Sequence, residues 1–260
     1  MKGDPTKDIP VNENMEFIEA CPACRGTDIP ITVVVYEAGD PVMFCSICED
    51  CGQNFLNPRY TDEYTNTYYQ GKYRNERNGG LSSEDMRHQF LRAHLQKDVI
   101  REKVPAGTSS LEIGSSLGCL LSELHKLGYT DCVGVEPDKR YHKYFPANNF
   151  TCYSDISQVP KRPFDLIAML HSLEHINHPL DFMRSVIENY THQGTHFFIE
   201  VPNINYERPL YLPHHPINFN QKTLNGLFER LGCEVVYSSW WTMSNIPGKP
   251  YVVGVYKRAP

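Results

Sequence analysis

Long apolar runs are missing from this sequence of 260 residues. No stretch approaches the roughly 20 apolar residues that a membrane-spanning helix needs, and the polar segment from Met1 to Asn14 lacks the apolar centre of a secretory signal peptide. These absences argue against a membrane segment and favour a cytoplasmic protein. With 40% hydrophobic and 22% charged residues, the composition is that of an ordinary globular protein. The length allows one large α/β domain and a small accessory unit.

An excess of positive charge is also missing. The chain has 25 Lys and Arg against 31 Asp and Glu, which gives a formal net charge of −6. Proteins that bind nucleic acid over a broad surface normally present a basic face. We therefore expect no nucleic-acid partner that binds over a broad surface, while a local basic groove remains compatible with this charge.

Cysteine is plentiful, and its spacing is informative. Five of the nine cysteines fall in the first fifth of the chain with C-x-x-C spacing. The first pair is Cys21/Cys24, and the second is either Cys45/Cys48 or Cys48/Cys51, of which the C-x-x-C-G turn ending at Gly52 favours the latter. Four thiolates from two such pairs suit structural Zn²⁺. A redox dithiol is the rival interpretation, disfavoured because no βαβ pattern surrounds the pairs. The other cysteines lie singly in apolar segments and are expected in the core: Cys119, Cys132, Cys152 and Cys233.

The segment from Leu111 to Gly118 predicts a strand, a tight turn and a helix. An apolar run ends at Gly114, and a helical pattern of leucines begins after Gly118. Glycines in such a turn let the backbone approach a ligand, and the helix N-terminus offers unpaired N–H groups beside it. A second strand ends at Glu136, where a carboxylate can accept both hydroxyls of a ribose. A nucleoside-type ligand is therefore predicted.

The spacing Glu112-x-Gly114-x-x-x-Gly118 resembles the first motif of class I S-adenosylmethionine-dependent methyltransferases, with Ser116 in place of the middle glycine. The resemblance implies that Asp155, after the strand near residues 150–153, accepts a hydrogen bond from the adenine amine; as a plain alternative, it caps the following turn. The cofactor-binding residues implied by the resemblance are Glu112, Gly114, Ser115, Gly118, Glu136, Asp155, Leu170 and Tyr73.

A second resemblance concerns the N-terminal part. Cys48-x-x-Cys51-Gly52 is followed by Asn57-Pro58-Arg59 and by Tyr68-Tyr69-x-x-x-Tyr73. This order is similar to bacterial methyltransferases of sugars and natural products that begin with a zinc ribbon. The resemblance implies that Cys21, Cys24, Cys48 and Cys51 hold Zn²⁺ and that the tyrosines lie near cofactor and substrate. Alternatively, the tyrosines pack the ribbon against the main domain.

Alternating strand and helix patterns continue to the end of the chain. Ser82-x-x-Asp85 caps a helix that covers the sheet, a short helix follows at Asp138 to Phe145, and Asn220 caps another. Counted from the strand that contains Leu111, there are seven strands, and the last two are joined without a helix, so they must be antiparallel. We predict a Rossmann-like seven-stranded methyltransferase sheet with helices on both faces. The predicted parts are a flexible N-terminus (1–14), a zinc ribbon (15–60), a helical lid or linker (61–106) and a class I methyltransferase domain (107–260).

The apolar strand 164–170 ends in His171-Ser172-Leu173-Glu174-His175. Ligands and catalytic groups collect at the carboxyl ends of strands in open α/β sheets. Histidine suits removal of a hydroxyl proton near neutral pH. The predicted catalytic residues are His175 first, His171 second, Glu174 as orienting or substrate-contacting group, and His215 as a further partner. For each histidine, a backbone hydrogen bond at the strand end is the plain alternative.

The same turn resembles the E-x-x-E-H motif of ubiquinone-biosynthesis and small-RNA methyltransferases, in which the acids and the histidine hold a divalent metal ion. Here His171 replaces the first acid, and the loss of a hard oxygen ligand disfavours Mg²⁺ at His171/Glu174/His175.

The combined prediction is a methyltransferase that transfers a methyl group from S-adenosylmethionine to a small-molecule hydroxyl. The alternatives are a nucleic-acid methyltransferase or binding protein that uses the ribbon to recognise nucleic acid, an NAD-dependent oxidoreductase, and an inactive scaffold. The first is disfavoured because only Arg25 and the nearby Arg59 stand out as basic residues of the ribbon.

Overall fold

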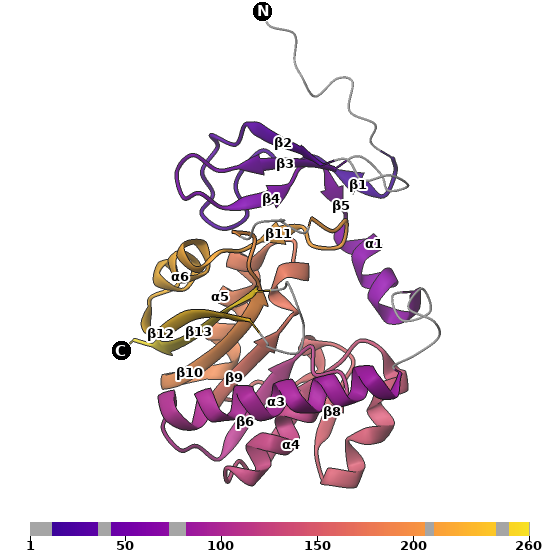
Figure 1. Cartoon of the computed structure of the whole chain (residues 1–260), viewed down its shortest axis with the longest axis vertical. Coiled ribbons are helices and arrows are strands. Elements are labelled where there is room, and N and C mark those ends of the chain that lie inside the picture. Colours follow the sequence, from indigo (N-terminus) through magenta and orange to yellow (C-terminus); the bar gives the residue numbers. More distant parts are fainter. Residues whose placement is uncertain (1–11, 36–42, 73–81, 206–210, 243–249, 260) are drawn as a thin grey trace, which may run out of the picture.

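The computed structural model describes residues 12–35, 43–72, 82–205, 211–242 and 250–259, and every structural statement below concerns these residues. Tyr73 and most of the predicted flexible N-terminus lie outside them. Figure 1 shows a small N-terminal β unit above a larger α/β body, with the helix α1 beside the two.

The body contains a seven-stranded sheet in the order β12-β13-β10-β9-β6-β7-β8. Neighbouring strands from β10 to β8 pair in parallel, while β13 runs antiparallel to both β10 and β12. The predicted antiparallel final pair and the seven-stranded fold are thereby confirmed. The strands are β6 (Ser109–Ile113), β7 (Asp131–Val135), β8 (Thr151–Tyr153), β9 (Phe164–Leu170), β10 (Thr191–Pro202), β12 (Cys233–Thr242) and β13 (Pro250–Arg258).

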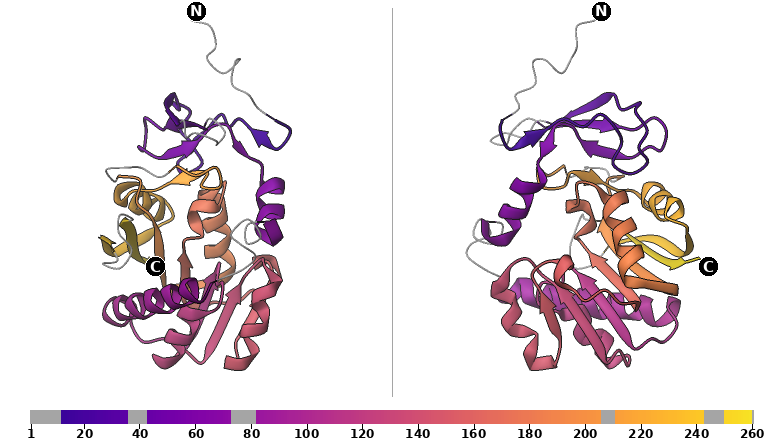
Figure 2. Two further views of the ribbon diagram at one scale, coloured as in Figure 1. Left: turned by 45° about the vertical axis from the view of Figure 1, so that its right-hand side comes forward. Right: turned by 180° about the vertical axis from the view of Figure 1, so that it is seen from behind.

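Helices cover both faces of this sheet, as seen from two sides in Figure 2. Alternate residues of the central strands serve the two faces: Leu166 and Phe198 belong to one apolar cluster, and Ile167 and Phe197 to the other. Because both faces are covered, β9 is an apolar run from Phe164 to Leu170, interrupted only by Asp165. The helices α3 (Ser83–Lys103) and α4 (Cys119–Lys126) contribute to the first cluster, and α5 (Pro179–Tyr190) and α6 (Gln221–Arg230) to the second.

Helices begin at all three places where the sequence predicts them, and one of them is of the 3₁₀ type. Ser82 and Asp85 form a capping box at the start of α3, and Asn220 caps α6. At Asp138 to Phe145 the structure has a 3₁₀ helix instead, η2 (Lys139–Tyr144), which begins where the Asp138 carboxylate accepts the N–H of Arg140. None of the described helices is long and apolar enough to cross a membrane.

The N-terminal unit is a four-stranded sheet in the order β11-β4-β3-β2, with a separate pair of β1 and β5. Its strands are β1 (Met15–Glu16), β2 (Ile31–Val35), β3 (Met43–Ile47), β4 (Asn54–Leu56) and β5 (Arg59–Tyr60). The edge strand β11 (Ile217–Asn218) comes from far later in the chain and pairs antiparallel with β4. The sheet of the predicted ribbon therefore extends beyond residues 15–60 into the second half of the chain.

Further contacts fasten the N-terminal unit over the turn that follows β9. The fully buried Arg59 donates from Nη1 to the Asn177 carbonyl (2.5 Å) and from Nε to Glu16 (3.0 Å). After β5 the chain forms α1 (Asp62–Thr67) and a π-helical turn, η1 (Tyr68–Lys72). This path carries the tyrosines of η1 to the same turn.

Candidate functional site

A glycine turn connects β6 to α4 at the carboxyl edge of the sheet. Gly114 (φ 85°) and Gly118 (φ 70°) both have left-handed backbone conformations, which favour glycine. A Cβ atom on Gly114 would lie 2.7 Å from the Cβ of Ser172, so the turn after β9 approaches the glycine too closely for a side chain. Ser115 is buried, and its hydroxyl donates to the Val135 carbonyl (3.3 Å).

Two predicted acids flank this turn. The buried Glu136 accepts the N–H of Ser116 (2.8 Å) and the N–H of Asp138 (2.9 Å), so its carboxylate ties β7 to the glycine turn. Burial raises the pKa of Glu112 well above its ordinary value, and the charge of Glu136 adds to this effect. The Oε2 atom of Glu112 has no hydrogen-bond partner among the described residues. A positively charged ligand group at this place would therefore stabilise the ionised form of Glu112.

The other predicted cofactor residues are placed less centrally. Asp155 is exposed at the end of β8, where it accepts hydrogen bonds from the N–H (2.8 Å) and the hydroxyl (2.6 Å) of Ser157. It therefore caps the short 3₁₀ helix η4 (Ile156–Gln158), and its adenine-binding role stays a prediction. Leu170 is half-buried at the last position of β9. Tyr73 lies outside the described residues.

His171, directly after β9, has a positive φ of 51°, which is strained for a non-glycine residue. Its Nε2 atom lies 3.0 Å from Oε1 of Glu200 on the neighbouring strand β10. Because an ionised carboxylate only accepts hydrogen bonds, Nε2 carries the hydrogen, and in the neutral ring Nδ1 carries the lone pair. Nδ1 faces Glu174 at 3.6 Å. The ring also meets Tyr251 edge-on, at 4.6 Å between centroids.

Glu200 is fully buried and belongs to a network that sequence reasoning did not find. Oε1 also accepts hydrogen bonds from two side chains of α3, Arg92 Nη2 (2.6 Å) and Gln96 Nε2 (2.8 Å). Burial by itself would raise the pKa of Glu200, but the charge of Arg92 and the hydrogen bond of His171 outweigh it and lower this pKa to about 2. The helix α3 thus covers the sheet, and its residues Arg92 and Gln96 stabilise the ionised carboxylate of Glu200 beside His171.

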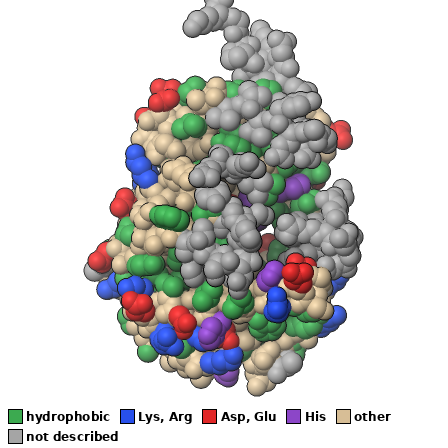
Figure 3. Space-filling view, viewed as in Figure 1, with side chains coloured by type: hydrophobic (Ala, Val, Ile, Leu, Met, Phe, Trp, Pro, Cys, Tyr) green, Lys and Arg blue, Asp and Glu red, His purple; other side chains and the backbone are tan. Residues whose placement is uncertain are grey.

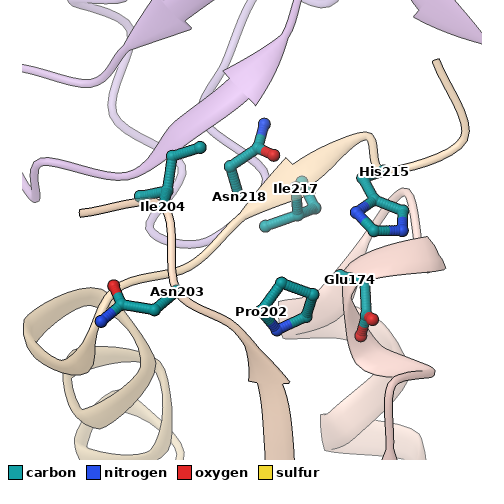
Figure 4. Close-up of a pocket in the computed structure, with 7 residues that line it drawn as sticks. All are labelled: Glu174, Pro202, Asn203, Ile204, His215, Ile217 and Asn218. Atoms are coloured by element: carbon teal, nitrogen blue, oxygen red, sulfur yellow. The ribbon is translucent and has the colours of Figure 1, made fainter. Parts of the chain in front are cut away.

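The other catalytic candidates meet beside this histidine. Glu174 and His175 lie on a 3₁₀ turn, η5 (Leu173–His175), and His215 lies just before β11. Ligand atoms of these three side chains lie within 4.8 Å of one another, and Figure 4 shows Glu174 and His215 among the residues that line one pocket, on different elements. Burial raises the pKa of Glu174 to about 8. Neither of its carboxylate oxygens has a hydrogen-bond partner among the described residues.

Tyr69 of η1 reaches this group as well. Its hydroxyl lies 2.6 Å from His175 Nδ1, and that nitrogen lies 2.7 Å from the His214 carbonyl oxygen. Tyr68 stacks on the His214 ring at 3.7 Å between centroids. The two tyrosine predictions therefore do not exclude each other, since Tyr68 packs and Tyr69 touches a candidate catalytic histidine.

The four predicted metal ligands come together in the N-terminal unit. The Sγ atoms of Cys21 and Cys51 are 3.7 Å apart, and those of Cys24 and Cys48 are 3.6 Å apart. Four sulfurs around one Zn²⁺ at about 2.3 Å would form a tetrahedron with edges of about 3.8 Å. A hydrogen bond from Cys21 lowers the pKa of Cys51 to about 5, which favours a thiolate. Cys45 is not part of this cluster, and burial raises its pKa to about 12, so it fits a core thiol.

The two basic residues of the N-terminal unit singled out in the sequence are engaged within the protein. Arg25 forms an ion pair with Asp181 of α5, and Arg59 is buried. Among the described residues on the face shown in Figure 3, Lys and Arg side chains are interspersed with Asp and Glu and form no broad basic surface. These observations give no support to the use of this unit as a nucleic-acid reader.

Comparison with known proteins gives one match to a protein family and matches to solved structures. Residues 83–238, more than half of the chain, match a family described as a methyltransferase domain. A search of curated protein sequences gives no match.

Three solved structures illustrate the likeness. The Burkholderia thailandensis 1,6-didemethyltoxoflavin-N1-methyltransferase with bound 1,6-didemethyltoxoflavin and S-adenosylhomocysteine is 12% identical, with a TM-score of 0.63 over 88% of this chain and 100% of that chain. The magnesium protoporphyrin IX methyltransferase of Synechocystis PCC 6803 with bound S-adenosylhomocysteine is 9% identical, with a TM-score of 0.55 over 76% and 100%. An S-adenosylmethionine dependent methyltransferase of Mesorhizobium loti is 15% identical, with a TM-score of 0.50 over 62% and 96%. At these identities the likeness shows the fold alone.

Proposed function

This chain belongs to the methyltransferase domain family, and on that premise we propose that it transfers the methyl group of S-adenosylmethionine to a hydroxyl group of a small molecule. The observation that carries the proposal is the juxtaposition of the glycine turn with the His171–Glu200 pair at one edge of the sheet. The bound ligands named for two structural neighbours, S-adenosylhomocysteine in both and 1,6-didemethyltoxoflavin in one, support this methyl donor and a small-molecule acceptor. The choice of a hydroxyl as the accepting group rests on the His171–Glu200 pair, which can take up a proton.

The residues around the glycine turn fit this methyl donor. When bound, S-adenosylmethionine supplies a methyl carbon on a positively charged sulfur, and an acceptor oxygen displaces that sulfur, which keeps the electron pair of the broken bond. Glu136 would hold the ribose hydroxyls, and Gly114 leaves the backbone of the turn accessible. The protonated amine of the donor would satisfy Glu112, whose Oε2 atom is buried without a partner among the described residues.

For a hydroxyl acceptor, a base must take the proton as the new bond forms. The sequence placed His175 first for this role, but the contacts favour His171. The ionised Glu200 orients the His171 ring and would stabilise its positive charge after it accepts the proton, as a carboxylate does in other carboxylate–histidine pairs. The Nδ1 atom of His175, by comparison, contacts two neutral oxygens, those of the Tyr69 hydroxyl and the His214 carbonyl. We assign His171 as the base and Glu200 as its positioning residue.

We further propose that Cys21, Cys24, Cys48 and Cys51 bind a structural Zn²⁺ ion. The support is the sulfur spacing, which fits tetrahedral Zn–S geometry. Since this unit shares strand β11 with the body, the ion would stabilise the segment that carries His215.

Thermal unfolding with separate additions of S-adenosylmethionine, S-adenosylhomocysteine and NADH tests the proposal. A ligand at a hundred times its Kd stabilises the native state by about 2.7 kcal/mol, which raises the unfolding midpoint measurably. We expect a rise with the two adenosyl compounds and none with NADH. The rise should be lost in Glu136→Ala and kept in the control Glu188→Ala, which changes an exposed residue of α5. An acceptor screen would then follow release of S-adenosylhomocysteine with hydroxylated small molecules. Absence of a rise with both adenosyl compounds would refute the proposal.

A further inference from the structure

Glu174, His175 and His215 form a cluster that the proton transfer described above does not use. We propose that these three side chains bind a divalent transition-metal ion beside the methyl-transfer site. Their ligand atoms lie within 4.8 Å of one another. Ligands of one ion at about 2.0 Å lie roughly 3.3 Å apart, so binding would require only small side-chain rotations.

The strongest sign of a missing partner is Glu174. Its side chain is 2% exposed, and neither carboxylate oxygen has a hydrogen-bond partner among the described residues. Two histidine nitrogens close to it, Nδ1 of His171 at 3.6 Å and Nε2 of His175 at 3.9 Å, are beyond hydrogen-bond distance. Buried carboxylates in folded proteins are normally hydrogen-bonded, paired with a cation or bound to a metal. An ion between Glu174 and the histidines would supply the absent partner.

His175 is oriented as a metal ligand. The His214 carbonyl oxygen can only accept a hydrogen bond, so the Nδ1 atom that lies 2.7 Å from it carries the hydrogen. In the neutral ring Nε2 then carries the lone pair, and Nε2 is the atom that faces Glu174. A histidine that binds a metal through one nitrogen and donates to a backbone carbonyl from the other is a recurrent arrangement, because the second contact fixes the tautomer and the ring orientation.

The position of His215 completes the set from another part of the chain. Its ring meets the His175 ring at 4.7 Å between centroids and 72° between planes. A small cavity of about 30 Å³ opens between His215 and Glu174, with Pro202 and Ile217 among its walls. This set differs from His171/Glu174/His175, which the H-x-x-E-H spacing suggested, because the structure commits His171 to Glu200.

Two imidazole nitrogens and one carboxylate suit Mn²⁺, Fe²⁺, Co²⁺ or Zn²⁺ better than Mg²⁺ or Ca²⁺, which prefer oxygen ligands. Three protein ligands also leave coordination positions open. If the proposed function holds, the acceptor oxygen would occupy one of them, where the ion makes its hydroxyl more acidic. The proton would pass to His171 as the oxygen–methyl bond forms and the carbon–sulfur bond breaks, with the electron pair left on sulfur.

Co²⁺ binding to protein whose cysteine cluster already holds one Zn²⁺ per chain tests the inference. Equilibrium dialysis should give one Co²⁺ per chain, with a visible spectrum of nitrogen and oxygen ligation that lacks intense sulfur charge-transfer bands. Glu174→Gln and His215→Asn should each weaken Co²⁺ binding by at least about tenfold. The control His192→Asn should bind Co²⁺ normally, because it changes a histidine that contacts a carboxylate, Asp165, at the opposite end of the sheet.

Each variant is also tested for S-adenosylhomocysteine stabilisation, which reports its fold and the methyl-donor site separately. Absence of a bound Co²⁺ in the wild-type protein, or unchanged binding in both Glu174→Gln and His215→Asn, would overturn the metal site even if S-adenosylhomocysteine binds. Co²⁺ binding that depends on both residues, without stabilisation by adenosyl compounds, would support the metal site and refute the proposed function.

Discussion

Replacement of Glu200 by glutamine tests the role of the negative charge that contacts His171, because it removes the charge and keeps the shape of the side chain. The side chain is fully buried, and a single oxygen accepts hydrogen bonds from Arg92, Gln96 and His171. Glutamine has nearly the same shape but no charge. The change therefore leaves Arg92 without its buried counter-ion and creates no cavity.

The size of the effect follows from the lowered pKa. A native pKa of about 2, against an ordinary value of 4.5, corresponds to roughly 3 kcal/mol of stability near pH 7. Because the native pKa of Glu200 is lower than the unfolded one, this contribution is complete above about pH 4.5 and is lost as the pH falls toward 2. The free energy of unfolding of Glu200→Gln should therefore be roughly 3 kcal/mol lower than that of the wild type at pH 7, and this difference should shrink by about half at pH 3.

Urea unfolding of both proteins at pH 7 and at lower pH measures this deficit. The control Glu188→Gln makes the same chemical change on an exposed helix position, and its free energy of unfolding should stay within about 0.5 kcal/mol of wild type. In a methyl-transfer assay, Glu200→Gln should reduce kcat by about tenfold or more, since His171 loses its charged partner. A deficit below about 1 kcal/mol at pH 7, or one that does not change with pH, would refute an ionised Glu200 as the centre of this network.

Three further predictions concern other parts of the chain. Cys48→Ser should abolish the Zn²⁺ content measured by elemental analysis and lower the unfolding midpoint, whereas Cys45→Ser should keep one Zn²⁺ per chain; equal zinc loss in both variants would refute the assigned ligand set. Gly114→Ala should destabilise the protein by about 1–3 kcal/mol in urea unfolding, because the new Cβ meets Ser172 and the backbone has a positive φ; a change near zero would contradict this packing. Asp155→Ala should cost about 1 kcal/mol through loss of the cap and should also weaken S-adenosylmethionine binding in calorimetry; an unchanged Kd would leave only the capping role.

Local patterns were sufficient to predict the sheet and the glycine turn. The spacing of Gly114 and Gly118 and the position of Glu136 after a strand are short-range features, and the structure brings these residues together with Glu112 around one turn. The cysteine spacing likewise left two alternatives for the second pair, of which the structure assembles Cys48/Cys51. Such features depend on neighbours within a few residues, so a single sequence contains them.

The parts that could not be predicted depend on distant contacts. Glu200 interrupts the apolar stretch from Phe197 to Val201, which is a signal of a buried charge, but its partner Arg92 lies on a helix more than 100 residues earlier. The contact of Tyr69 with His175 depends on how the N-terminal unit sits over the body. The helix predicted at Asp138 to Phe145 became a 3₁₀ helix, a distinction that apolar periodicity in so short a segment does not make.

Strand β11 also has a consequence for the order of events during synthesis. Its partner strand β4 leaves the ribosome long before Ile217 exists, so the edge of β4 stays open while most of the body is still being made. The hairpin of β2 and β3 and the cysteine cluster need only early residues and can form first. His215, two residues before β11, reaches its place only when this last strand closes the edge. In a nascent chain the proposed zinc site would therefore be complete well before the candidate catalytic site.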